Sequence, residues 1–240
     1  MEYAVGHGKR INDMGKRLAT TAAQKIVSAR KRLQWELSQR LDPSEREFRR
    51  IWPSISTVEG LLVSPDQEHW FFTAARSLAD HAAIVEIGSF KGRSTCCFAY
   101  GCRGTSKHIF AIDTFQGNDS DFKEGASFRG GSYFDVFWNN LESRGLAEYV
   151  TPVRGLSTDA ARTWDKPIDL LFIDGSHVYE DVLADFDSFF PHVKPGGIVA
   201  FHDVHETWPG PTRVWQEVAA PKLTKTGALA TLTFGRKPHR

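Results

Sequence analysis

The most informative stretch of the sequence joins an apolar segment to a glycine-containing turn. It reads Ile84-Val85-Glu86-Ile87-Gly88-Ser89-Phe90-Lys91-Gly92-Arg93-Ser94-Thr95, the pattern of a buried strand, a turn and the start of a helix. Because Gly88 and Gly92 have no Cβ, the backbone there can take unusual dihedral angles and let a ligand come close. The first N–H groups of the helix add unsatisfied donors at the same place. In open α/β sheets, ligands bind outside the carboxyl ends of the strands, which is where this turn would lie.

The spacing of the glycines and two acidic residues indicates the ligand. A dinucleotide fingerprint reads G-x-G-x-x-G, whereas here three residues separate Gly88 from Gly92 and Glu86 comes just before them. An acidic residue at that point would repel a pyrophosphate but could pair with the ammonium of an amino acid. Asp113, followed by Thr114, ends the next apolar segment, and its carboxylate could accept hydrogen bonds from both hydroxyls of a ribose. A nucleoside joined to an amino acid is S-adenosylmethionine, so this is the predicted cofactor, and a nicotinamide-dependent oxidoreductase is disfavoured.

A second group of residues predicts a metal site. Asp174 and Asp203 each end one of two neighbouring predicted strands, so both should face the same crevice. Converging carboxylates repel each other unless a hard divalent cation, which prefers oxygen ligands, lies between them. His202 is a possible third ligand, but adjacent strand residues face opposite ways, so it could instead point into the core.

His177 lies three residues after Asp174, where the strand would turn into a helix. A neutral imidazole beside the metal could remove the proton of a hydroxyl as its oxygen attacks a methyl group. The alternative is that His177 caps the helix that follows Ser176 and is solvated. The motif favours the catalytic interpretation.

Over about residues 58–215 these motifs resemble the class I methyltransferases. The resemblance implies that cofactor-binding residues include Glu86, Gly88, Ser89, Gly92, Ser94, Asp113, Thr114, Gly155 and Ser157, the last two near the adenine. The Asp-Gly-Ser-His segment and the later Gly-Gly…His-Asp segment are similar to metal-dependent sugar O-methyltransferases of macrolide and aminocoumarin pathways and to related bacterial saccharide methyltransferases. That similarity implies a magnesium ion held by Asp174 and Asp203, with His177 as the base. His202 stands where an acid is usual, and an imidazole shifts the preference of a site away from magnesium.

The expected reaction is a metal-assisted O-methylation of a saccharide or glycosylated metabolite. A phenolic or catechol acceptor and a non-catalytic S-adenosylmethionine-binding module are the alternatives. The acceptor pocket is expected to involve the loop 114–131 and the segment from His205, Glu206 and Trp208 to Arg213. Tyr133, Phe134, Phe137 and Trp138 could stack on the acceptor, but such a cluster is more often the buried face of a helix.

Alternating strand and helix signals predict the elements that position these residues. Strands are expected at Ile84–Ile87, His108–Ile112, Val150–Val153, Leu170–Ile173 and Ile198–Phe201, with a last, antiparallel strand at Ala230–Phe234 at or near one edge. Helices are expected at about 93–102, 132–143, 157–164 and 178–190, and another from Ser64 to about Asp80, with Gln67 in a capping box. The fold class is therefore α/β, a Rossmann-like, doubly wound and mostly parallel sheet.

The N-terminal region differs from this body in charge. Residues 1–50 hold 12 Lys and Arg against 6 Asp and Glu, a net of +6, whereas the whole chain has +1. Apolar residues recur there at helical spacing, which predicts a helical arm over 1–55 and a methyltransferase domain over 56–240, with Asp42-Pro43-Ser44 as a turn. The arm is expected to pack on its own domain or to form a homo-oligomer, and a membrane or an acidic partner is the alternative.

Composition excludes several classes of protein. The near-neutral chain has no overall basic field that would indicate nucleic acid, and no apolar run approaches the length of a membrane span. The three cysteines lie within seven positions, at Cys96, Cys97 and Cys102, and form no zinc-like pair of pairs. A reducing cytoplasm is the expected compartment.

Overall fold

The computed structural model describes residues 42–60, 64–117 and 133–239. The chain divides into two compact units, Met1–Glu47 and Phe48–Arg240, and the sheet and the site belong to the second. Most of the predicted N-terminal arm lies outside the described residues. Helix α2 (Pro43–Ile55) begins where the sequence predicts a turn, and Oδ1 of Asp42 accepts hydrogen bonds from the backbone N–H and the hydroxyl of Ser44. The Asp-Pro-Ser segment is therefore a helix start rather than an interruption.

The sheet of the second unit has the predicted α/β architecture. Its strands are β1 (Ala83–Ile87), β2 (His108–Asp113), β3 (Val150–Arg154), β4 (Ile168–Ile173), β5 (Val193–Phe201), β6 (Thr224–Leu229) and β7 (Leu232–Arg236). Within the described residues their order is β3-β2-β1-β4-β5-β7-β6. The first five strands are parallel, and β7 pairs antiparallel with β5, as the predicted last strand should. Strand β6, at the edge beyond β7, was not predicted.

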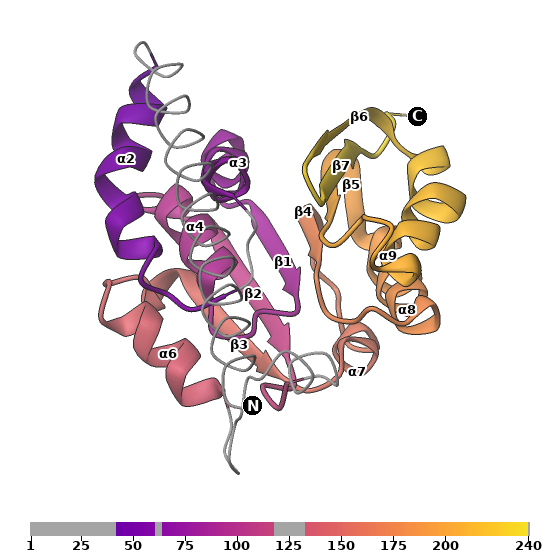
Figure 1. Cartoon of the computed structure of the whole chain (residues 1–240), viewed down its shortest axis with the longest axis horizontal. Coiled ribbons are helices and arrows are strands. Elements are labelled where there is room, and N and C mark those ends of the chain that lie inside the picture. The colour runs from indigo at the N-terminus through magenta and orange to yellow at the C-terminus, as the bar shows by residue number, and fades with distance from the viewer. Residues whose placement is uncertain (1–41, 61–63, 118–132, 240) are drawn as a thin grey trace, which may run out of the picture. The chain divides into compact units, whose positions relative to one another are not determined.

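Helices cover both faces of the sheet (Figure 1). The longer ones are α3 (Pro65–Ser77), α4 (Arg93–Cys102), α6 (Phe134–Glu142) and α8 (Tyr179–Phe189). Shorter ones are α7 (Ser157–Ala161), α9 (Pro209–Arg213), the 3₁₀ turns η1 (Ala147–Tyr149), η2 (Phe190–His192) and η4 (Ala220–Lys222), and the π-helical η3 (Val214–Ala219). Strand residues alternate between the two faces: Phe172 packs on Phe71 of α3 and Phe98 of α4, whereas Leu171 and Ile173 join the apolar cluster that contains α8.

Helix α3 begins at Pro65, a position where proline suits a helix because its missing N–H is not needed there. The predicted capping box is wrong, because Ser64 makes no side-chain cap hydrogen bond. The Gln67 side chain is instead fully buried, and its amide nitrogen donates to the carbonyl oxygen of Leu229, 3.0 Å away. Tertiary packing against the β6–β7 turn has therefore replaced the local cap.

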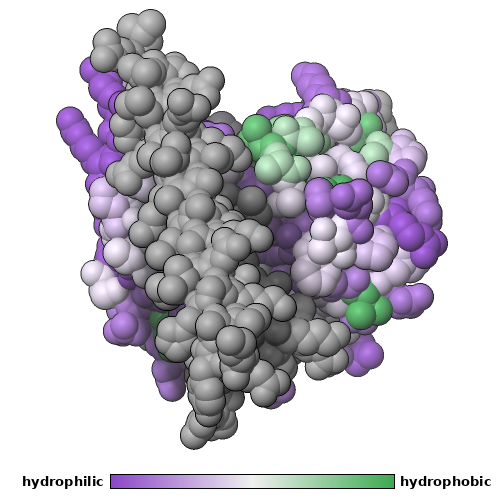
Figure 2. Space-filling model, in the orientation of Figure 1, coloured by the Kyte–Doolittle hydropathy of each residue, from purple (hydrophilic) through white to green (hydrophobic). Residues whose placement is uncertain are grey.

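In Figure 2 the described residues on the visible face are largely purple and white, and green hydrophobic residues occupy small areas of it. Among the described residues, no helix has both the length and the apolar character that crossing a membrane requires.

Candidate active site

A cavity of about 370 Å³ opens at the carboxyl ends of β1, β2, β4 and β5. Of the residues predicted to bind the cofactor, the metal or the reacting proton, it is lined by Gly88, Ser89, Ser94, Asp113, Thr114, Gly155, Ser157, Asp174, His177, His202 and Asp203. Glu86 and Gly92 do not line it. Residues from Gly88 to Asp203 thus meet at one sheet edge, because parallel strands present their carboxyl ends together.

The turn after β1 has a backbone that requires glycine. Gly88 takes a φ of +85°, and a Cβ at this position would lie 2.2 Å from the backbone oxygen of Asp174. The N–H of Gly88 donates to the carbonyl oxygen of Ile112, and the N–H of Asp174 donates to that of Ile87. The ends of β1, β2 and β4 are therefore joined by hydrogen bonds beyond the strands, and only a residue without a side chain fits between them.

Glu86 lies beneath this turn rather than in the cavity. Its side chain is fully buried, and its carboxylate accepts hydrogen bonds from the hydroxyls of Ser89 (3.1 Å), Ser94 (2.5 Å) and Thr95 (2.5 Å). Burial raises the pKa of this carboxyl to about 7, although the three hydroxyls favour the charged form. Glu86 thereby fixes the turn and the first residues of α4 from below.

Asp113 fixes the same turn from the side. Its Oδ2 accepts the backbone N–H groups of Ser89 (2.8 Å) and Phe90 (2.7 Å), and its Oδ1 accepts that of Phe115 (2.6 Å). A carboxylate has about four lone-pair sites, so acceptor capacity remains toward the cavity, which this residue lines. Asp113 can therefore shape the turn and still accept hydrogen bonds from a ligand hydroxyl.

The predicted metal residues form one compact cluster. Asp174, His202 and Asp203 each present a ligand atom, and these atoms all lie within 4.8 Å of one another. Nδ1 of His202 is 3.3 Å from Oδ1 of Asp174 and 3.1 Å from Oδ1 of Asp203. Burial alone would lower the pKa of His202, but the two carboxylates outweigh it and raise this pKa to about 10. Two acidic groups and one imidazole thus converge where the sequence predicts a cation.

The backbone explains how His202 and Asp203, which are neighbours in sequence, both face this cluster. Strand β5 ends at Phe201, so the alternation of side chains no longer applies beyond it. Asp203 takes a φ of +56°, a left-handed conformation that aspartate tolerates better than most residues. His202 is only 4% exposed, as the core interpretation expected, and its Nδ1 nevertheless points to the carboxylates.

His177 lies at the edge of the cluster. Its Nε2 is 2.9 Å from Oδ2 of Asp203, and its ring stacks on Trp208 with centroids 3.8 Å apart. A Cβ on Gly210 would lie 2.1 Å from the backbone oxygen of His177, so the first turn of α9 packs directly on this residue. Because a carboxylate only accepts hydrogen bonds, a neutral His177 carries its proton on Nε2, and Nδ1 is its basic nitrogen.

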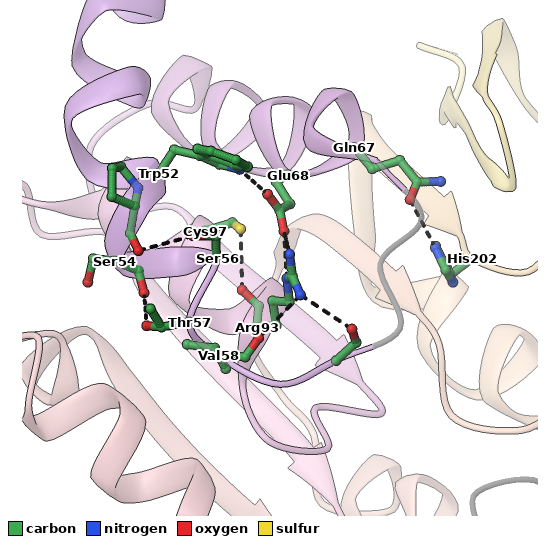
Figure 3. A network of polar contacts seen from close by, with 12 residues as sticks. Trp52, Ser54, Ser56, Thr57, Val58, Gln67, Glu68, Arg93, Cys97 and His202 are labelled. Carbon is green, nitrogen blue, oxygen red and sulfur yellow. Dashed lines mark hydrogen bonds and ion pairs between the residues drawn. The ribbon is translucent and has the colours of Figure 1, made fainter. Parts of the chain in front are cut away.

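A buried ion pair holds another wall of the cavity (Figure 3). The carboxylate of Glu68, on α3, is 2.5 Å from Nε of Arg93 and 2.5 Å from Nε1 of Trp52. The guanidinium of Arg93 also donates to the carbonyl oxygens of Val58 and Gly60, each at 3.3 Å. Gly60 and Arg93 both line the cavity, so the ion pair positions the segment before α3 against the site.

Several residues of this site were not predicted from the sequence. Asp185 of α8 is 5% exposed, lines the cavity and accepts a hydrogen bond from the hydroxyl of Ser157. Burial raises its pKa to about 6. Asp185 stands in no motif, and Arg93 stands in the glycine-turn segment but was given no role there. Only their helical faces could have suggested that they point inward.

The predicted acceptor residues are only partly brought together. Trp208 contacts His177, but His205 and Glu206 are exposed and do not line the cavity. Of the predicted aromatic cluster, Tyr133 and Phe137 are buried in the core, whereas Phe134 and Trp138 are only partly buried. Of the expected loop 114–131, residues 118–131 lie outside the described residues.

The sequence matches a known protein family. Residues 85–204, half of the chain, match the family described as "Methyltransferase domain". The chain belongs to this family.

Individual relatives are more distant. An uncharacterised protein of Sinorhizobium fredii is 36% identical over 143 residues, which are 57% of this chain and 15% of that protein. Demethylmacrocin O-methyltransferase of Streptomyces fradiae is 44% identical over 45 residues, 18% of this chain and 11% of that one. The chain thus spans a small part of both relatives.

A solved structure extends the likeness of the fold to nearly the whole chain. The O-methyltransferase TomG of Streptomyces achromogenes, involved in tomaymycin synthesis and solved with S-adenosylmethionine, has a TM-score of 0.61 and 18% identity. The match covers 90% of this chain and 99% of TomG.

Proposed function

We propose that this methyltransferase transfers the methyl group to a hydroxyl oxygen, with a divalent cation held by Asp174, His202 and Asp203. The observation that carries this proposal is the position of the acidic cluster, which lines the same cavity as the glycine turn. A methyl donor and an acceptor hydroxyl could therefore occupy one enclosed space. The names of a relative and of a structural neighbour, both O-methyltransferases, support the same reaction.

The cofactor assignment follows from the turn. Ser89 and Ser94 line the cavity above Glu86, and Asp113 offers acceptor capacity beside them. We assign the methionine part of the cofactor to the turn and the ribose to Asp113. Gly155 and Ser157, at the end of the neighbouring strand β3, then lie on the adenine side.

The donor set suits a divalent cation. Two carboxylates and one imidazole nitrogen within 4.8 Å of one another resemble the mixed oxygen and nitrogen sets that bind manganese, iron or zinc, while magnesium prefers oxygen alone. A cation there would supply Lewis acidity, which lowers the pKa of a nearby hydroxyl. Magnesium remains the ion implied by the related sugar methyltransferases, so both kinds of ion belong in the test.

The chain's own residues supply the proton transfer. Asp203 accepts the Nε2 proton of His177 and Trp208 packs on the ring, so Nδ1 is held in a defined direction. His177 then takes the proton of the acceptor hydroxyl at Nδ1, while its oxygen forms the new bond to the methyl carbon and the bond from sulfur to that carbon breaks. The products are the methyl ether and S-adenosylhomocysteine. Positioning and a preorganised electrostatic environment account for most of the acceleration in such a scheme.

The proposed acceptor is a saccharide or a glycosylated metabolite. Its support is the similarity to demethylmacrocin O-methyltransferase and the acidic cluster, which could hold a cation close to adjacent sugar hydroxyls. A catechol offers adjacent oxygens too and is the second candidate.

Calorimetry and a product assay test these points. S-adenosylmethionine should bind and NADH should not. A panel of glycosides and catechols, assayed for S-adenosylhomocysteine with added magnesium or manganese, should give turnover that a chelator abolishes. Turnover that persists unchanged in the chelator would contradict the metal role. Cofactor binding without product on any acceptor would favour a non-catalytic module.

For the organisation of the chain, we infer a basic arm over residues 1–55 and a catalytic domain over 56–240, with the arm joining copies of the chain. The support is the helical spacing of apolar residues over residues 1–50, which lie outside the α/β repeat, together with their excess of Lys and Arg. Light scattering on the full chain and on a chain that lacks residues 1–40 tests it, and an unchanged molar mass per particle, corrected for the deletion, would contradict it.

A further inference from the structure

The ring of His202 has a second contact on the side away from the carboxylates. Its Nε2 lies 3.4 Å from Oε1 of Gln67 and 3.3 Å from the hydroxyl oxygen of Thr231. Figure 3 shows Gln67 reaching from α3 to this ring. Both Gln67 and His202 are buried, at 0% and 4% exposure, so water does not compete freely for these atoms.

The orientation of the Gln67 amide is fixed by a third partner. Its nitrogen lies 3.0 Å from the carbonyl oxygen of Leu229, which can only accept a hydrogen bond. The second hydrogen of the same nitrogen is directed to the Thr231 hydroxyl, 3.1 Å away. The amide nitrogen must therefore face the β6–β7 turn, and the amide oxygen must face His202.

This orientation determines which nitrogen of His202 carries a proton. The amide oxygen of Gln67 has no hydrogen to donate, and two lone pairs facing each other in a buried place would repel. The Gln67 oxygen therefore favours a proton on Nε2 of His202, and the Thr231 hydroxyl, which can accept as well as donate, is compatible with it. In a neutral imidazole that carries its proton on Nε2, the lone pair lies on Nδ1, which points to Asp174 and Asp203.

From these contacts we propose that Gln67 is a positioning residue for the metal site. Its amide oxygen accepts the Nε2 proton of His202 and leaves Nδ1 as the atom that binds a divalent cation together with Asp174 and Asp203. When a cation binds, any proton on Nδ1 passes to solvent, while the proton on Nε2 stays. The inference rests on the proposed metal site, and it adds a residue outside the ligand set that fixes the ligand's tautomer. Partners of this kind are common behind histidine ligands.

The tautomer can be read directly by NMR. Long-range ¹H–¹⁵N spectra of the full chain, metal-free and loaded with Zn²⁺, should show the Nε2 proton of His202 in both states. When Zn²⁺ binds, the ¹⁵N chemical shift of Nδ1 should change to that of a metal-coordinated nitrogen. A His202 that lacks a proton on Nε2, or that binds Zn²⁺ through Nε2, would overturn the proposal.

Metal affinity gives a second, independent readout. Gln67→Leu removes the acceptor at nearly constant volume and should weaken Zn²⁺ binding by about 10–100-fold in calorimetry, with S-adenosylmethionine affinity unchanged. Gln67→Glu keeps an acceptor toward Nε2 but loses the donor to Leu229, so it should retain more of the affinity than Gln67→Leu. The matched control is Thr73→Val, on the same helix, whose hydroxyl donates to the carbonyl oxygens of His69 and Trp70 in α3. Because Gln67→Leu could fail to fold, Thr231→Val is a second, milder variant. It removes the hydroxyl that contacts Gln67 and His202 and should weaken Zn²⁺ binding a few-fold.

Different results would contradict the proposed metal site and the proposed role of Gln67. If the wild-type chain binds neither Zn²⁺, Mn²⁺ nor Mg²⁺ in the presence of S-adenosylmethionine, the metal site itself is wrong. If the wild type binds Zn²⁺ and Gln67→Leu, correctly folded by circular dichroism, binds it equally well, the metal site stands and the role of Gln67 is wrong.

Discussion

Nε2 of His177 lies 2.9 Å from Oδ2 of Asp203, and the other oxygen of that carboxylate lies 3.1 Å from Nδ1 of His202. One carboxylate therefore links the proposed base to the proposed cation site. The linkage orients His177 without making it a member of the three-residue cluster. The functions of the two histidines should consequently be separable by substitution.

His177→Ala should lower turnover by about 10²–10⁴-fold, because a positioned base contributes about that much. Affinities for S-adenosylmethionine and for Zn²⁺ should change little.

Asp174→Asn should abolish Zn²⁺ binding and metal-dependent turnover together, since a neutral amide is a poor substitute in a charge-neutralising site. For both variants, S-adenosylhomocysteine release measures turnover and calorimetry measures the Zn²⁺ and S-adenosylmethionine affinities. His205→Ala, an exposed histidine outside the cavity, is the control, and a large rate loss there with none in His177→Ala would exchange their roles.

The first turn of α9 should also affect turnover, because it packs on His177. In Gly210→Ala the new Cβ would lie 2.1 Å from the backbone oxygen of His177, so the backbone that carries the imidazole must move. We expect a large fall in turnover with S-adenosylmethionine affinity retained. Gly104→Ala is the comparison: its φ is +75°, but nothing lies within 4 Å of the added atom. It should cost about 1 kcal/mol of stability and leave turnover unchanged. Equal effects of the two substitutions would argue against positioning by α9.

The sequence predicted the carboxyl ends of β1, β2 and β4 well, because these apolar segments run into Gly88, Asp113 and Asp174. It predicted the cluster of Asp174 and Asp203 for the same reason, since parallel strands place their ends at one edge. The orientation of His202 could not be predicted, because it depends on the left-handed backbone of Asp203. Gln67 was assigned to a local cap because the spacing from Ser64 fits one. Its real partners, Leu229 and Thr231, are more than 160 positions away, beyond the reach of any local pattern.

Substitution of Asp113 should separate cofactor binding from folding. Asp113→Ala removes the acceptor for the amides of Ser89 and Phe90 as well as the proposed ribose contact. S-adenosylmethionine affinity should fall by about 2–4 kcal/mol, the value of two charge-assisted hydrogen bonds. Calorimetry measures the affinity, and circular dichroism tests whether the sheet persists. An unchanged affinity would exclude Asp113 from the cofactor site.

Glu86 should make stability depend on pH. Its folded-state pKa of about 7 lies above the ordinary 4.5, so the folded chain holds this proton to higher pH than the unfolded chain does. The free energy of unfolding should therefore fall as pH rises from about 4.5 to about 7. A pKa difference of this size corresponds to about 3 kcal/mol. Glu86→Gln should gain stability relative to the wild type between pH 5 and pH 8, as urea unfolding would show. Glu142→Gln, at an exposed position, is the control and should not gain stability over this range. Equal pH profiles of stability for the wild type and Glu86→Gln would contradict the prediction.

Arg93→Met should unfold more easily than the wild type and should bind the cofactor more weakly. The Glu68 carboxylate is 1% exposed, so loss of its guanidinium partner leaves a buried charge beside Trp52, at a cost of about 3–5 kcal/mol. Glu68→Gln combined with Arg93→Met removes that charge and should recover much of the stability. Cofactor affinity should not recover, because Gly60 still lacks its hydrogen bond from Arg93. Urea unfolding measures the stability, and calorimetry with S-adenosylmethionine measures the affinity. If the double variant recovered affinity together with stability, the ion pair would act on the cavity only through folding.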